Sequence, residues 1–227
     1  MKDGFVKAAA ASPVIKVADA EYNAQQVIKC MAAAREKGVK LLVFPELTLT
    51  GCFCYDLVGH RVLLEGAAAA LEKVVKASEG TDMLVLVGLP YAFGSRLLSC
   101  AAVVYDGALL ALIPRENVAG SRFADYPGEG ELVYVGALET ELCPGALFAH
   151  RSLNGLTVTV ELGADVTAAD SPTAYYAQSG ATVIAQMASF PATVSSTDDA
   201  LLAARRAAVL DTDPCYIIFT SGSTGVP

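Results

Sequence analysis

The sequence predicts an α/β fold in which parallel and antiparallel strands share a sheet. Residues 39–44 and 83–88 are continuous apolar runs of strand length, and each follows a segment whose apolar residues recur at helical spacing. Continuous apolar runs of this kind are typical of strands that are buried on both faces, as in parallel β-α-β units. The pair Asp106-Gly107, between the apolar residues 100–105 and 108–113, is a strong signal for a hairpin of antiparallel strands.

The first β-α-β unit is expected at the N-terminus. Residues 5–10 have the pattern of a buried strand, and Asp19 can then cap the N-terminus of a helix. The apolar face of this helix consists of Ala24, Val27, Ile28, Met31 and Ala34. Gly38 ends the helix, and the strand 39–44 then places Glu46 at the edge of the sheet.

A second helix and a second strand repeat this order. The apolar face of the second helix consists of Leu64, Ala67, Ala68, Leu71, Val74 and Val75. Gly80 ends this helix before the strand 83–88, because glycine readily adopts the left-handed conformation found after helix ends. The hairpin of residues 100–105 and 108–113 comes next along the chain.

The second half of the chain begins with an expected loop. Residues 114–136 have no regular apolar spacing and are rich in glycine, proline and charge, so we expect a long, functional loop. Residues 156–161 and 181–187 then have strand patterns. Residues 198–209 are expected to form a helix that opens at acidic residues, and residues 216–220 the last strand.

Composition excludes several classes of protein. The chain has 227 residues, of which 54% are hydrophobic and 18% charged, and this suits a single well-buried domain over residues 1–227. A net charge of -8 without any Lys/Arg cluster speaks against binding nucleic acid. The longest apolar stretch, residues 97–113, is interrupted by Ser99, Asp106 and Gly107, so we expect no membrane span. The first residues lack the long apolar region of a signal peptide, which predicts a cytoplasmic protein.

The cysteines predict neither disulfides nor a metal site. Six cysteines are scattered along the chain, and in a chain of this size without an export signal we expect them to be reduced thiols. Cys52 and Cys54 form a C-x-C pair, but no second pair and no nearby histidine completes a set of metal ligands.

Several segments resemble a known family in the same order along the chain. Residues 41–51 read LLVFPELTLTG and resemble the strand and turn that carry the catalytic glutamate of the nitrilase superfamily, and residues 82–90 and 99–103 resemble its next segments. The opening of the chain and residues 155–161 and 179–185 are most similar to the glutaminase domain of glutamine-dependent NAD synthetase. This resemblance implies a nitrilase-like four-layer αββα sandwich, which agrees with the mixed strand pattern.

The resemblance also implies a site, of which only part is retained. Hydrolysis of the glutamine amide by covalent catalysis needs a thiol nucleophile, a base and a positive donor for the oxyanion, and the family uses Cys, Glu and Lys. Glu46 matches the base, whose pKa burial would raise, and Arg115 stands at the lysine position. Gly163 stands at the cysteine position, within the residues Val-Glu-Leu-Gly-Ala-Asp at 160–165, so the nucleophile position is vacant.

Other interpretations of these residues remain open at the level of the sequence. Glu46 could be an ordinary carboxylate at a strand end, Arg115 a solvated charge of the loop, and Cys100 or Cys143 a replacement thiol. The family's second glutamate and its Leu-Pro-Asn-Tyr element have no clear counterpart in residues 118–125, and its later asparagine is replaced in residues 187–191. We therefore expect a domain that derives from the glutaminase part of glutamine-dependent NAD synthetase, an enzyme of NAD biosynthesis. We expect its amidase activity to be impaired.

The C-terminal residues 211–227 resemble a second family. Their run Ser221, Gly222, Ser223, Thr224, Gly225 is similar to the phosphate loop of adenylate-forming enzymes, whose backbone N–H groups and hydroxyls bind ATP phosphates. A terminal strand that has drifted in sequence explains the same residues. We expect no cofactor, and ATP only if this motif is functional.

The expected partners follow from these resemblances. We expect a small-molecule amide such as glutamine as the ligand and a homo-oligomer as the assembly, with neither nucleic acid nor membrane as a partner. Two alternatives remain, a non-catalytic scaffold or oligomerisation module and a fragment of an ATP-dependent adenylate-forming ligase.

Overall fold

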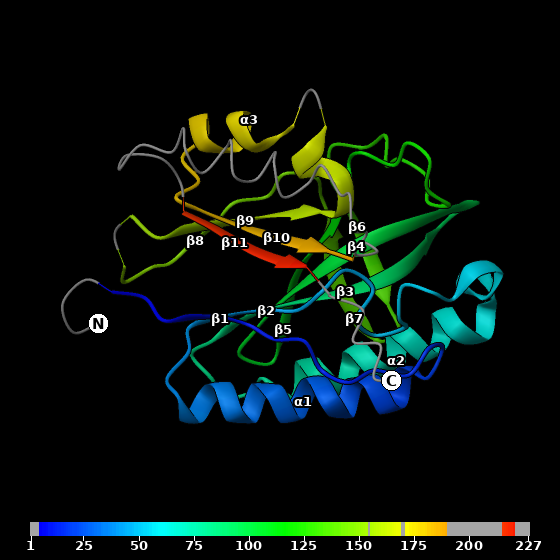
Figure 1. Ribbon diagram of the computed structural model, residues 1–227, viewed down its shortest axis with the longest axis horizontal. Coiled ribbons are helices and arrows are strands. Elements are labelled where there is room, and N and C mark those ends of the chain that lie inside the picture. Colours follow the sequence, from blue (N-terminus) through cyan, green and yellow to red (C-terminus); the bar gives the residue numbers. More distant parts are fainter. Residues whose placement is uncertain (1–4, 154, 169–170, 190–214, 221–227) are drawn as a thin grey trace, which may run out of the picture.

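Two β-sheets stacked face to face, with helices on both outer faces, make up the fold. The computed structural model describes residues 5–153, 155–168, 171–189 and 215–220. Figure 1 shows helices α1 (Ala20–Glu36) and α2 (Arg61–Ala77) on one side of the sheets and α3 (Thr173–Gln178) on the other. This arrangement is the predicted four-layer αββα sandwich.

The larger sheet has seven strands in the order β1-β2-β3-β4-β5-β7-β6. These strands are β1 (Ala8–Ala10), β2 (Leu41–Val43), β3 (Leu84–Phe93), β4 (Arg96–Tyr105), β5 (Ala108–Pro114), β6 (Glu131–Val135) and β7 (Leu138–Leu142). Parallel pairing joins β1, β2 and β3, whereas β4 runs antiparallel to both β3 and β5. The carboxyl ends of β2 and β5 therefore lie at the same edge of this sheet.

The smaller sheet has four strands in the order β11-β10-β9-β8. These strands are β8 (Phe148–Ala149), β9 (Thr157–Leu162), β10 (Val183–Ala188) and β11 (Cys215–Thr220). Strands β9, β10 and β11 are parallel to one another, and β8 is antiparallel to β9. Two short 3-10 helices, η1 (Tyr55–Gly59) and η2 (Gly163–Thr167), come after β2 and β9 along the chain.

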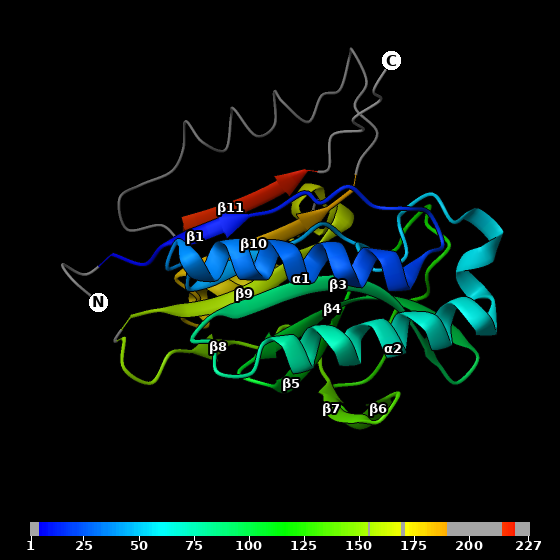
Figure 2. The ribbon, with the colours of Figure 1, turned by 90° about the horizontal axis from the view of Figure 1, so that it is seen from below.

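The continuous apolar run in β2 reflects burial on both faces of the larger sheet. Leu41 and Val43 pack into the core between the two sheets, while Leu42 and Phe44 pack into the core beneath α1 and α2. Each fully buried side chain of this size contributes about 1.5–3 kcal/mol to folding. Figure 2 shows α1 and α2 lying beside each other across the larger sheet, where they cover the second of these cores.

The helix ends lie where local chemistry predicts them. The Asp19 carboxylate accepts a hydrogen bond from the Tyr22 backbone nitrogen at 3.0 Å and caps α1. Gly38 and Gly80, with φ angles of 69° and 66°, follow the ends of α1 and α2. On α2 the buried positions are Leu63, Ala67, Ala70, Leu71, Val74 and Val75. The predicted face was therefore right at four positions, and Leu64 and Ala68 are half-buried.

The first predicted strand was wrong in length and in burial. Only Ala8–Ala10 is a strand, its first and last residues are exposed, and the Phe5 side chain is 81% exposed. The reason is the position of β1 at the edge of the larger sheet, where β2 is the only described strand that is hydrogen-bonded to it. An apolar run alone does not distinguish an edge strand from a central one.

The expected long loop was wrong at its C-terminal end. Residues 131–135 form β6, which makes an antiparallel hairpin with β7 through Gly136, whose φ is 60°. Val133 and Val135 are buried whereas Leu132 and Tyr134 are exposed, so the strand has an alternating pattern. The surrounding glycine, proline and charged residues hid this short alternation in the sequence.

The hairpin at Asp106-Gly107 is confirmed. These residues have φ angles of 45° and 77°, and Tyr105 pairs with Ala108 across the turn. A second hairpin was not predicted. Strands β3 and β4 extend to Phe93 and Arg96, on either side of a turn at Gly94.

Several predicted segments near the C-terminus lie outside the described residues. These are the helix 198–209 and residues 211–214 and 221–227 of the C-terminal motif. The last predicted strand, 216–220, is confirmed as β11, which pairs in parallel with β10. The short helix α3 was not predicted. Within the described residues, no helix has the length and apolar character that crossing a membrane requires.

Candidate functional site

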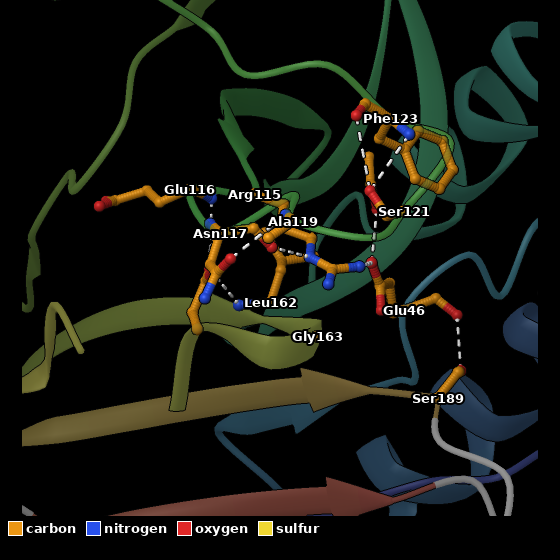
Figure 3. A network of polar contacts seen from close by, with 12 residues as sticks. Glu46, Arg115, Glu116, Asn117, Ala119, Ser121, Phe123, Leu162, Gly163 and Ser189 are labelled. Atoms are coloured by element: carbon orange, nitrogen blue, oxygen red, sulfur yellow. Dashed lines mark hydrogen bonds and ion pairs between the residues drawn. The ribbon is translucent and has the colours of Figure 1, made fainter. Parts of the chain in front are cut away.

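Three strand ends meet at one place between the two sheets. Glu46 follows β2, Arg115 follows β5 and Gly163 follows β9 (Figure 3). Arg115 Nη1 lies 3.3 Å from Glu46 Oε1, and a Cβ atom built on Gly163 would lie 2.6 Å from Arg115 Cζ. The fold thus brings together the three residues that the family resemblance predicted for the base, lysine and nucleophile positions.

The turn after β2 holds Glu46 against the neighbouring strand β3. Phe44 N donates to Leu86 O at 2.9 Å, and Leu49 N donates to Gly88 O at 3.1 Å. Leu47 has a φ of 56°, a left-handed conformation that reverses the chain after Glu46. Gly88 has no side chain, and this allows the turn to lie directly on the backbone of β3.

Glu46 is a buried carboxylate with two charged or polar partners. Its exposed fraction is 5%, and its Oε1 accepts a hydrogen bond from Ser99 Oγ at 2.8 Å in addition to the contact with Arg115. Burial raises the pKa of the Glu46 carboxyl above its usual value, although the charge of Arg115 and the Ser99 hydrogen bond act in the opposite direction. This environment differs from that of an ordinary solvated carboxylate at a strand end.

Arg115 is directed into the protein rather than into solvent. Its side chain is 11% exposed, its backbone nitrogen donates to Ser99 O at 2.9 Å, and its Nε donates to Asn117 O at 2.7 Å. The interpretation of Arg115 as a solvated loop charge was therefore wrong. The pairing of β5 with β4 holds the Arg115 backbone, and the inward guanidinium is balanced by the buried carboxylate of Glu46.

Gly163 forms a sharp elbow between β9 and η2. Its φ is 52°, in the left-handed region that glycine adopts at little cost, and the preceding Leu162 is extended. The Gly163 carbonyl accepts a hydrogen bond from Gln186 Nε2 at 3.3 Å. A Cβ atom at this position would also lie 2.8 Å from both Nε and Nη1 of Arg115. The Arg115 guanidinium thus occupies the place where a side chain at position 163 would begin.

Asp165 joins the loop after β5 to the elbow after β9. Its carboxylate accepts from Asn117 N at 2.6 Å, Leu162 N at 3.1 Å and Glu116 N at 3.4 Å, and the residue is 2% exposed. Burial raises the pKa of Asp165 to about 6, against the opposing effect of these backbone N–H groups. The sequence showed Asp165 only as part of the motif at residues 160–165, and its role in joining the two segments was not predicted.

Burial disfavours ionisation of the two thiols that were considered as replacement nucleophiles. Cys100 belongs to the core beneath α1 and α2, on the opposite face of β4 from Ser99, and burial raises its thiol pKa. Burial, with a smaller effect of Glu141, raises the pKa of Cys143 to about 11. Neither thiol would be ionised at neutral pH.

A different thiol lies near Glu46, and sequence reasoning considered it only as a metal ligand. Cys52 is half-buried and hydrogen-bonds with the Ser189 side chain, whose Oγ donates to the Glu46 carbonyl oxygen at 3.1 Å. Burial raises the pKa of Cys52, and the Glu46 charge raises it further. The signal available in the sequence was the position of Cys52 six residues after the base.

A cavity of about 440 Å³ adjoins Arg115. It lies between the loop after β5 and the tyrosines of α3, and its lining includes Arg115 together with Glu116, Asp125 and Glu129. Tyr176 donates a hydrogen bond to Glu116 beside this cavity, which both residues line. The cavity therefore presents both signs of charge to a ligand.

Metal and nucleotide sites have no support in the part of the chain that the structure describes. That part contains no group of three or more His, Cys, Asp or Glu side chains that could hold a metal ion. The predicted phosphate loop, Ser221 to Gly225, lies outside it.

Comparison with known proteins gives consistent matches. The model of the carbon-nitrogen hydrolase family matches residues 7–218. The chain is 32% identical to the glutamine-dependent NAD(+) synthetase of Mycobacterium tuberculosis over 211 residues, and 30% identical to that of Mycobacterium leprae over 213 residues. These alignments cover 90% and 91% of this chain but 31% of each synthetase, so the chain spans about a third of the length of these relatives.

Solved structures of low sequence identity share the fold. A glutamine-dependent NAD(+) synthetase from Cytophaga hutchinsonii superposes with a TM-score of 0.71 at 18% identity, over 87% of this chain and 33% of that one. An amidase from Nesterenkonia sp. has a TM-score of 0.67 at 18% identity, over 90% of this chain and 73% of that one. A mutant of that amidase adds acrylamide at its active-site cysteine.

Proposed function

Because this chain belongs to the carbon-nitrogen hydrolase family, we propose that it is a glutaminase-type domain whose amidase activity is impaired. The observation that carries the proposal is the elbow after β9, where Gly163 lies against the guanidinium of Arg115. The family relationship supports the origin of the site, and the missing side chain supports the loss of its chemistry.

The chemistry of amide hydrolysis explains why this one residue matters. A thiolate must attack the amide carbonyl carbon, and a base must take the thiol proton before the amine leaves. A mutant of the related amidase from Nesterenkonia sp. adds acrylamide at its active-site cysteine. Gly163 has no atom that can attack, so Glu46 has no nucleophile to deprotonate at this position.

Ammonia release from glutamine tests the proposal. The purified chain is incubated with glutamine, and free ammonia is measured with a coupled dehydrogenase assay. We expect release at the rate of buffer alone, both in the unaltered chain and in Glu46→Gln. Release well above buffer that disappears in Glu46→Gln would show that another nucleophile serves the site and would refute the impaired assignment.

A small-molecule amide such as glutamine remains the proposed ligand. The cavity beside Arg115 has a volume suited to an amino acid, and its arginine and carboxylates complement the two charges that an amino acid carries. Calorimetric titration with glutamine should show weak, saturable binding that is lost in Arg115→Ala. Absence of binding at millimolar glutamine would contradict this part of the proposal.

A second candidate function is that of a scaffold or oligomerisation module. Strand β6 is at the edge of the larger sheet, and its outward residues Leu132 and Tyr134 are 63% and 59% exposed. Exposed apolar residues on an edge strand favour association with another chain. Light scattering should then show a homo-oligomer that Leu132→Lys disrupts, whereas a monomer at all concentrations would exclude this function.

A further inference from the structure

We propose that Arg115 and Gly163 act as one coupled unit, in which the arginine guanidinium occupies the volume of the absent nucleophile. Arg115 is then a positioning residue that closes the space between Glu46 and the elbow. The inference rests on the proposed function for its interpretation of position 163, but its physical content is a contact that can be measured separately.

With Arg115 in its present position, a side chain at position 163 would contact the guanidinium too closely. A built Cβ atom would lie 2.6 Å from Arg115 Cζ and 2.8 Å from both Nε and Nη1. Favourable contacts between carbon atoms are roughly 3.5–4.0 Å, so these distances are strongly repulsive. Either the guanidinium or the elbow must move when a Cβ atom is added.

The guanidinium is not free to move aside at low cost. Its Nε donates to Asn117 O at 2.7 Å, its Nη1 lies 3.3 Å from Glu46 Oε1, and the side chain is 11% exposed. Displacing it would remove the positive partner of a carboxylate that is 5% exposed. An unpaired buried charge is strongly unfavourable, so the two residues are coupled through Glu46 as well as by direct contact.

The backbone adds a second penalty that is independent of Arg115. Gly163 has a φ of 52°, and any residue with a Cβ atom is strained in this region. Substitution at position 163 therefore has two separable effects, a backbone strain present in every background and a clash present only with arginine at position 115. A double-mutant cycle separates them.

The consequence for chemistry is that a thiol alone cannot restore the site. With Gly163→Cys, the sulfur and the guanidinium compete for the same space. With Arg115→Lys added, the narrower ammonium group leaves that space free and keeps the positive charge. The arginine and the glycine thus exclude an amide carbonyl from the place where attack would occur.

Unfolding equilibria test the coupling. Gly163→Ala is compared in the unaltered chain and in Arg115→Lys by urea unfolding, followed by far-UV circular dichroism. We expect the folded-to-unfolded ratio to fall at least tenfold more with Arg115 present than with Arg115→Lys, in the range of coupling for residues in contact. Equal effects in the two backgrounds would overturn the inference.

A matched control isolates the backbone strain from the clash. Gly94 has a φ of 57°, close to that of Gly163, and a Cβ atom built on it would meet nothing within 4 Å. Gly94→Ala should therefore weaken folding equally with Arg115 and with Arg115→Lys. Should Gly163→Ala fail to fold alone, recovery of a cooperative transition by adding Arg115→Lys supports the coupling, and failure of both variants contradicts it.

Thiol reactivity provides a readout that a purely structural contact would not change. Acrylamide is the probe, because a glutamate-to-glutamine mutant of the related amidase adds it at the active-site cysteine. In Gly163→Cys with Arg115→Lys, peptide mapping should show alkylation at position 163 about tenfold faster than in Gly163→Cys alone. Equal rates in both backgrounds would contradict the proposal.

The two proposals fail in distinguishable ways. Ammonia release by the unaltered chain would refute the impaired function and leave the double-mutant cycle interpretable. Additive effects at positions 115 and 163 would refute the coupling, whatever the outcome with glutamine.

Discussion

Replacing Gly88 with alanine is expected to push the Glu46 turn away from β3. A Cβ atom built on Gly88 would overlap the backbone nitrogen of Leu47 and lie 2.8 Å from the Pro45 carbonyl oxygen and 2.9 Å from the Glu46 carbonyl carbon. All of these are backbone atoms, which cannot rotate aside as a flexible side chain can. Gly88 is not in the left-handed region, so the expected effect is purely steric.

The magnitude follows from packing and from the hydrogen bonds that hold the turn. Inserting a methyl group into a closely packed core usually costs about 1–3 kcal/mol. The hydrogen bond from Leu49 N to Gly88 O, 3.1 Å long, would be strained as the turn moves, at about 0.5–1.5 kcal/mol. We therefore expect Gly88→Ala to lower the free energy of unfolding by about 2–4 kcal/mol.

Urea unfolding followed by far-UV circular dichroism measures this loss, since the chain contains no tryptophan for fluorescence. Gly66→Ala in α2 is a matched control, because its Cβ atom would meet only Ala20 Cβ, at 3.9 Å. In the control, the free energy of unfolding should rise by about 0.5–1 kcal/mol, because alanine has a higher helix propensity than glycine. If Gly88→Ala lowered the free energy of unfolding by less than about 1 kcal/mol, with an unchanged dependence on urea concentration, the argument that this glycine makes room for the turn would be refuted.

Three further predictions concern stability. The raised pKa of Asp165, about 6 against a usual value of 3.8, means that the folded state binds this proton more tightly, so its contribution to the free energy of unfolding falls by about 3 kcal/mol in total as pH rises from about 3 to about 7. In Asp165→Asn this part of the pH dependence should vanish, and an unchanged profile would contradict the assignment. Ser99→Ala should lower the free energy of unfolding by about 1–2 kcal/mol at pH 7, because Glu46 loses its 2.8 Å hydrogen bond. An unchanged urea midpoint would contradict this prediction. Gly107 has a φ of 77°, so Gly107→Ala should lower the free energy of unfolding by about 1–2 kcal/mol. Gly107→Asn should lower it clearly less, because asparagine tolerates the left-handed region better than alanine. Equal losses in the two variants would argue against backbone strain.

Local patterns predicted much of the fold because they depend on neighbours along the chain. The helix faces around Val27 and Val74 follow the helical period, and the Asp106-Gly107 turn depends on two adjacent residues. Patterns were less informative where sheet position matters. The exposure of β1 and the pairing of β6 with β7 depend on which strands lie beside them, and the short alternation in residues 131–135 was hidden among loop-like residues.

The three candidate site residues could be named from the sequence, but their geometry could not. Glu46, Arg115 and Gly163 were identified from segments that resemble the family. Ser99 and Asp165 were missed as site residues because each acts through residues distant in the chain, Glu46 for the first and Asn117 for the second. Their hydrogen bonds form only after the chain has folded.

The amino-acid sequence alone was enough to establish the αββα class, most of the order of strands and helices, and the absence of a side chain at Gly163. That this position is filled rather than open became evident only from the folded chain. Gly163 and Arg115 are far apart in the sequence, and their contact requires the ends of β5 and β9, in different sheets, to meet. Because the guanidinium takes its position from Glu46 and Asn117 as well, packing rather than local preference determines what the site can accept.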